Sequence, residues 1–81
     1  MNEKVRRLLA LREKASEREG REMWRSAVAD NLIELLASGA SVNLYMLRQR
    51  IEAEITSTTN THLRGQLLGA RDMLDDLATR N

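Results

Sequence analysis

The sequence has 81 residues, enough for one small domain, and it contains one histidine and no cysteine. Disulfides are therefore excluded, and one chain cannot supply the usual zinc ligands. The 13 Lys and Arg nearly cancel the 12 Asp and Glu, so no strong overall field attracts nucleic acid or a lipid surface. A domain this small has a thin stability margin, and of disulfides, metals and partners only a partner remains as support.

The composition indicates helices throughout. Proline and phenylalanine are absent, aromatic residues make up 2% of the chain, and Leu, Ala, Glu and Arg dominate. These residues favour helices, and few of the others favour a sheet. We therefore expect residues 1–81 to form a single all-α domain with three helices, a long first helix followed by a helical hairpin, resembling a helical bundle.

The first predicted helix spans about residues 3–37. Apolar residues recur at spacings of three and four in residues 5–9 and again in residues 24–36. Trp24 forms a large apolar protrusion with its neighbour Met23. A tryptophan usually belongs to a core, but it is also enriched at the centres of binding surfaces, so both roles are open at this point.

The middle of this helix is its weakest part. Between residues 12 and 22 few residues are apolar, and Gly20 costs roughly 1 kcal/mol relative to alanine in a helix interior. Ser16 and Glu19 also fit a capping box, so a new helix could begin there. A break near residues 16–20 is one interpretation, and we favour a near-continuous helix because no proline or loop enforces a break.

The second predicted helix spans about residues 42–55. Gly39 follows the last apolar turn of the first helix, where a left-handed residue often ends a helix, and Ser41 can cap the next one. The main apolar stripe consists of Leu44, Leu47, Ile51 and Ile55, and it is widened by Val42, Tyr45 and Met46. This apolar surface is wider than one neighbouring helix would cover.

The third predicted helix spans about residues 62–78 and follows a hydroxyl-rich loop, residues 56–61. It has the cleanest pattern in the chain, a heptad seam of Leu63, Leu67, Ala70, Leu74 and Leu77. We expect this seam to pack against the second helix, with the first helix lying across the hairpin and partly projecting. Gly65 and Gly69 lie one turn apart on another side, where close packing and simple exposure are both open interpretations.

We expect no catalytic activity and no metal or cofactor. His62 is alone and belongs to the first turn of the third helix, where capping or solvent exposure is its expected role. Asp72, Asp75 and Asp76 are expected to form a solvated acidic face rather than a cation site. Because they lie near a helix C-terminus, we also expect them to attract a basic surface such as residues 6–12 of the same or another chain.

The stretch from Asn31 to Ile51 resembles the DNA-binding front of plasmid KfrA-type proteins, in which a helix ends in a glycine and a short turn leads to the next helix. The resemblance implies a helix-turn-helix whose contacts with DNA would come from Asn43, Tyr45, Arg48 and Arg50. The chain departs from that pattern in its spacing. It also lacks a basic third helix, because three aspartates accompany Arg64 and Arg71.

The segment from His62 to Leu77 resembles the C-terminal helices of short helical proteins of tailed phages, among them virion and morphogenesis accessories. We therefore expect a non-enzymatic protein-protein interaction subunit, a phage-encoded structural or assembly accessory protein in the host cytoplasm or the virion. The alternatives are a small helix-turn-helix DNA-binding regulator and a phage inhibitor of a host protein.

The expected partner is another protein or a second copy, with no membrane and no small molecule involved. The residues predicted to carry the protein contact are Trp24, Leu32, Leu35, Met46, Leu63, Leu67, Leu74 and Leu77.

Overall fold

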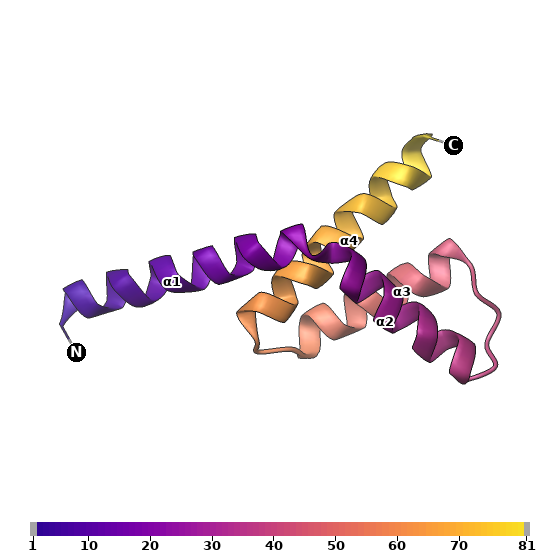
Figure 1. Cartoon of the computed structure of the whole chain (residues 1–81), viewed down its shortest axis with the longest axis horizontal. Coiled ribbons are helices and arrows are strands. Elements are labelled where there is room, and N and C mark those ends of the chain that lie inside the picture. The colour runs from indigo at the N-terminus through magenta and orange to yellow at the C-terminus, as the bar shows by residue number, and fades with distance from the viewer. Residues whose placement is uncertain (1, 81) are drawn as a thin grey trace.

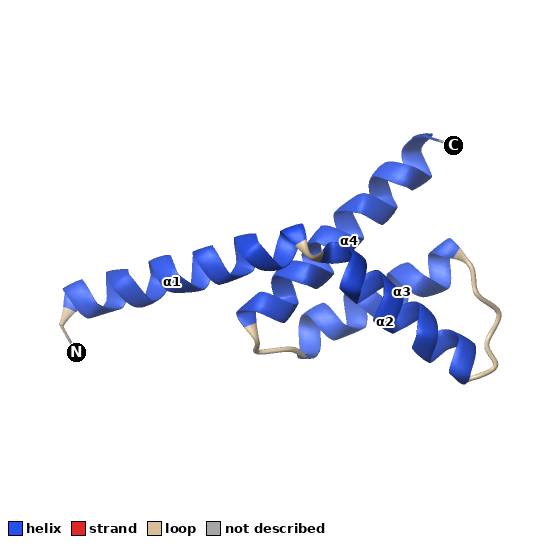
Figure 2. Cartoon of the chain, in the orientation of Figure 1, coloured by secondary structure: helices blue, strands red, loops and turns tan. Residues whose placement is uncertain are grey.

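The computed structural model describes residues 2–80. In that part of the chain the helices are α1 (Glu3–Glu22), α2 (Trp24–Ala37), α3 (Leu44–Ser57) and α4 (Thr61–Arg80), and no strand is present (Figure 2). The predicted all-α class is confirmed. The predicted count of three helices is wrong, because the first predicted helix is divided into α1 and α2.

Met23 separates α1 from α2. Its backbone angles, φ −102° and ψ 29°, lie outside the helical range, and its N–H donates to the carbonyl of Gly20. The break is therefore not at residues 16–20, where α1 continues without interruption. Nothing in the local sequence indicates this break, because methionine favours helices and the chain has no proline. The change of direction there lets α2 bury Ala27 and Leu35 against the rest of the molecule (Figure 1).

The other helix boundaries follow from local capping. Gly39 has φ 76°, as expected of the residue that closes α2. The N-cap of α3 is Asn43, whose side chain accepts a hydrogen bond from the Met46 N–H, so α3 begins later than the Ser41 cap predicted. At the start of α4 the side chain of Asn60 accepts from the Leu63 N–H at 3.0 Å.

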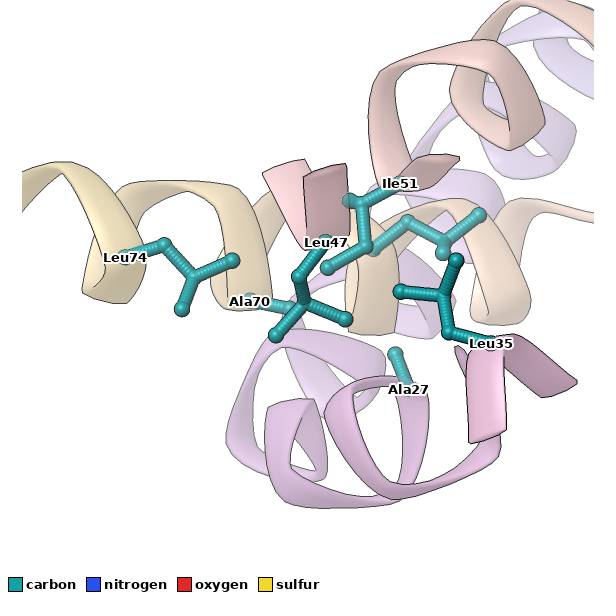
Figure 3. Packing of buried hydrophobic residues seen from close by; sticks show 7 residues of the cluster. Ala27, Leu35, Leu47, Ile51, Ala70 and Leu74 are labelled. Atoms are coloured by element: carbon teal, nitrogen blue, oxygen red, sulfur yellow. The ribbon is translucent and has the colours of Figure 1, made fainter. Parts of the chain in front are cut away.

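Helices α2, α3 and α4 enclose the hydrophobic core (Figure 3). Its buried members are Ala27, Leu35, Leu47, Ile51, Leu67, Ala70 and Leu74, and Ile55 and Leu63 pack against them. The predicted hairpin between the second and third helices is thus confirmed as the pair α3 and α4. Leu44 and Leu77, the outer ends of the two predicted stripes, are exposed instead.

Glycines allow α1 and α4 to cross in backbone contact. Gly20, Gly65 and Gly69 are all buried. A Cβ atom on Gly65 would overlap the backbone carbonyl of Glu17, and one on Gly69 would lie 2.8 Å from the carbonyl oxygen of Arg21. The close-packing interpretation of Gly65 and Gly69 is therefore confirmed. Gly20, in the weakly apolar middle of the first predicted helix, lies at this crossing, and the close packing there offsets its cost in helix propensity.

The crossing leaves the N-terminal part of α1 projecting from the molecule, whose extents are 50 × 28 × 17 Å (Figure 1). The predicted partial projection is thus seen for α1, which packs on α4, whereas α2 packs on both helices of the hairpin. Only its second half contributes to the packing, because every residue from Asn2 to Ala15 is exposed.

Asn31 on α2 is a polar residue in the core, with 1% of its surface exposed. Its Nδ2 donates to the Ala27 carbonyl at 2.8 Å, and its Oδ1 has no hydrogen-bond partner among residues 2–80. An unsatisfied buried acceptor costs about 1–3 kcal/mol. We expect Asn31→Leu to raise the free energy of unfolding by about 1–2 kcal/mol, since leucine has the same branched side-chain skeleton, fills the site with methyl groups and has no polar atom to desolvate.

Urea denaturation of the parent and of Asn31→Leu measures this difference. Asn31→Ala is the control, because it also removes the polar group but leaves a cavity and is expected to be less stable than Asn31→Leu. A lower unfolding free energy for Asn31→Leu than for the parent would contradict the prediction.

Candidate protein-binding surface

The first half of α1, residues 3–15, is called the arm below. At 1.5 Å per residue it is about 20 Å long, and no other described segment packs against it. The side chain of Asn2 caps its N-terminus by accepting from the Lys4 N–H at 3.0 Å. The arm is therefore a helix with a capped N-terminus that gains no tertiary contacts from the rest of the described chain (Figure 1).

One side of the arm is apolar. Val5, Leu8 and Leu9 are exposed, Leu8 by 63% of its surface, and they line a shallow hollow together with Arg12. These four residues are called the arm face. It continues into the crossing with α4, because Val5, Leu9, Ser16 and Gly20 follow one another at spacings of four, seven and four. The face that packs on α4 at one end of α1 is thus uncovered at the other end.

The arm also has an excess of positive charge. It contains five basic side chains, Lys4, Arg6, Arg7, Arg12 and Lys14, against Glu3 and Glu13. None of these seven groups takes part in an ion pair within residues 2–80. The predicted contact of residues 6–12 with the three aspartates of the same chain is therefore not made.

A second uncovered apolar surface lies on α2. Ala29, Ile33 and Leu36 are exposed at spacings of four and three, which places them along one side of the helix, and Ile33 and Leu36 each expose 62% of their surface. These three residues are called the α2 strip. Asp30 lies beside Ala29 and makes no ion pair with another described residue. Residues 26–47 contain no basic residue at all.

Most of the predicted contact residues serve the chain's own core. Leu35, Leu67 and Leu74 are buried in it, and Trp24, Leu32 and Leu63 pack against it. Met46 and Leu77 are the two that remain exposed, by 36% and 45%. The leucine seam of α4 is buried against α2 and α3 except at Leu77. The exposed apolar residues of the folded chain therefore lie mainly in the arm, on α2 and at the start of α3.

The predicted DNA-contacting residues are at the start of α3, and their polar groups are largely engaged. Asn43 caps the helix, and the Tyr45 hydroxyl accepts from Gln49 Nε2 at 2.7 Å. Arg48 makes a two-bonded contact with Asp75, and Arg50 pairs with Glu34. Both arginines thus already bind carboxylates of α4 and α2, respectively.

The aspartates of α4 belong to an ion-pair network on the molecular surface. Asp72 pairs with Arg21 of α1, and Asp75 pairs with Arg48 of α3. Arg71 connects these two pairs, because it lies within 3.6 Å of Asp72 and 3.5 Å of Glu52, and Glu52 in turn lies 3.5 Å from Arg48. The remaining aspartate, Asp76, pairs with Arg80 in its own helix. The acidic face therefore links α4 to α1 and to α3 by ion pairs on the surface.

The strongest pair in this network makes stability depend on pH. The hydrogen bond from Arg48 holds the pKa of Asp75 below its usual value of 3.8, and the same bond raises the pKa of Arg48. Because folding lowers the pKa of Asp75, the pair stabilises the fold fully above pH 3.8, and this contribution is lost as the pH falls through the lower folded value.

We expect Asp75→Asn to unfold at a lower temperature than the parent at pH 7, and the difference to shrink as the pH is lowered below 3.8. Thermal unfolding followed by circular dichroism between pH 2 and 7 measures it. Asp76→Asn is the control, since its partner Arg80 is in the exposed last turn of α4 and links no second helix. Equal melting of the parent and Asp75→Asn at pH 7 would refute the prediction.

None of the contact residues predicted from the sequence belongs to the arm or to the α2 strip. A signal for the strip exists in the sequence, because Ile33 lies outside the apolar stripe that contains Leu32 and Leu35, although Leu36 is only one turn beyond Leu32. Whether such off-stripe residues are covered depends on a neighbouring helix, which the sequence does not identify.

Other kinds of site find no support within residues 2–80. No group of three or more His, Asp or Glu residues in that range lies close enough to hold a metal ion. None of its helices combines the length and the apolar character that a membrane crossing requires. No protein-family model matches the sequence, and no curated protein or solved structure matches it either.

Proposed function

We propose that this chain is a non-enzymatic protein-binding subunit and that the arm is its binding element. The observation that carries the proposal is the arm face: Val5, Leu8 and Leu9 lie uncovered on a helix that projects from the rest of the molecule. A helical segment of about 13 residues without tertiary contacts is marginal in water, so docking on a partner would stabilise the arm as well as bury its apolar face.

The biological role that fits this design best is that of a structural or assembly accessory protein of a tailed phage. The support is the resemblance of residues 62–77 to such proteins and a shape in which one helix extends from a small helical body. The DNA-binding alternative has weaker support, because Arg48 and Arg50 would have to leave Asp75 and Glu34 to reach phosphates.

The proposal is tested by placing a photo-crosslinking amino acid at Leu8 in cells that produce the protein. We expect protein adducts at this position, because Leu8 is in the arm face. The control is the same amino acid at Ala10, which is also exposed but is turned away from the arm face. The absence of any protein adduct at Leu8, or equal adducts at both positions, would contradict the proposal.

The identity of the adduct decides between the two protein-binding roles. A structural or assembly accessory is expected to crosslink to virion components or to itself. An inhibitor is expected to crosslink to a host enzyme in a fixed stoichiometry, and that result would replace the accessory role while leaving the arm as the binding element.

A further inference from the structure

We propose that the arm face docks antiparallel on the α2 strip of a second copy of this chain. This inference rests on the proposed function, because it names the partner of the arm. It is argued from three properties of the two surfaces: where they lie in the molecule, how their residues are spaced and what charges accompany them.

The two surfaces cannot cover each other within one chain. The tip of the arm and the C-terminal end of α2 lie at opposite ends of the molecule, whose long axis measures 50 Å (Figure 1). Both surfaces are helix faces of the same kind, exposed and apolar. A second copy supplies the missing neighbour for each of them without requiring any change in the fold.

The two faces have the same length. Val5, Leu9 and Arg12 follow at spacings of four and three, and so do Ala29, Ile33 and Leu36. Each face therefore extends over two helical turns, about 10 Å. Antiparallel alignment reverses the order of the second series to three and four. Val5 then lies opposite Leu36 and Arg12 opposite Ala29, while Leu9 and Ile33 are offset by one residue, about 1.5 Å along the helix axis, and still pack against each other.

The same alignment gives Arg12 a suitable environment. It lies opposite Ala29, the smallest residue of the α2 strip, and next to Asp30, which has no ion-pair partner among the described residues. A parallel alignment would instead press Arg12 against Leu36. The antiparallel arrangement thus leaves room for the guanidinium and supplies a carboxylate to it.

The charges favour this pairing over one between two arms. The arm has three more basic than acidic residues, whereas the segment 26–47 has no basic residue and two acidic ones, of which Glu34 pairs with Arg50 and Asp30 makes no ion pair with another described residue. Two arms packed together would bring like charges into contact. The two docking surfaces differ, and each copy carries both of them. Successive copies can therefore associate head to tail into a ring or an open chain of subunits.

The test uses two variants that each lack one of the two surfaces. Leu9→Asp places a charge in the arm face, and Ile33→Asp places a charge in the α2 strip. Both side chains are exposed in the parent, so each variant is expected to fold. Sedimentation velocity is expected to show concentration-dependent assembly of the parent. Each variant alone should be monomeric, with an association constant weakened roughly thirtyfold or more.

An equimolar mixture of the two variants is the decisive sample. The arm of Ile33→Asp and the α2 strip of Leu9→Asp are both intact, so the mixture is expected to form a dimer of one copy of each and nothing larger. If Ile33→Asp alone assembles like the parent, or if the mixture stays monomeric, docking of the arm on the α2 strip is refuted. Ala10→Asp introduces the same charge away from the arm face and is expected to assemble like the parent.

A charge exchange tests the alignment. Arg12→Asp and Asp30→Arg are each expected to weaken assembly roughly tenfold, and the double variant is expected to recover most of the loss. No recovery in the double variant would overturn the antiparallel pairing of Arg12 with Asp30.

The outcomes for the two proposals can be told apart. A parent chain that remains monomeric up to millimolar concentration refutes self-docking, yet the Leu8 crosslink to a different protein would still support the arm as a binding element. A monomeric chain without a Leu8 adduct refutes both proposals.

Discussion

Replacing Leu67 by alanine is expected to lower the free energy of unfolding by about 2–5 kcal/mol. Leu67 has 0% of its surface exposed and lies in the core between α2, α3 and α4. The substitution loses the burial of the leucine side chain and leaves a cavity that the rigid helices fill only partly. In a domain of this size such a loss removes a large part of the total stability.

Urea denaturation at 25 °C measures this change, with Leu8→Ala as the matched control. The same atoms are removed at Leu8, but that side chain is 63% exposed, so we expect a change within about 0.5 kcal/mol. Equal losses at Leu67 and Leu8 would mean that the arm is packed in the free chain or that Leu67 is not in the core.

Substituting Gly65 by alanine is expected to destabilise the fold by about 1–3 kcal/mol, through overpacking. The Cβ atom would overlap the Glu17 carbonyl, a backbone atom that no side-chain rotation can move away, so α1 and α4 would have to separate. Helix propensity by itself predicts the opposite sign, because alanine is favoured over glycine by roughly 1 kcal/mol within a helix.

The sign of the change is therefore the test. Ala53→Gly on the exposed side of α3 measures the propensity difference in this protein, and it is expected to lower stability. If Gly65→Ala raises the melting temperature by as much as Ala53→Gly lowers it, the crossing of α1 and α4 is not in backbone contact.

The features that the sequence by itself determined are those set by neighbours along the chain. The all-α class follows from the absence of proline and the abundance of helix-forming residues. The end of α2 at Gly39 requires a residue that tolerates a positive φ. The pairing of α3 with α4 follows from apolar stripes at helical spacing, because a stripe can be buried only against another stripe.

The tertiary structure alone decided where the first predicted helix divides and which apolar residues stay outside. Met23 has no helix-breaking character, and the break arises because α2 must turn to bury Ala27 and Leu35. Gly20 is a helix-weakening residue until α4 lies against it. The leucines of α4 and those of the arm have the same chemistry. They differ in burial. Burial depends on contacts between residues far apart in the sequence, and residue type and spacing do not specify these contacts.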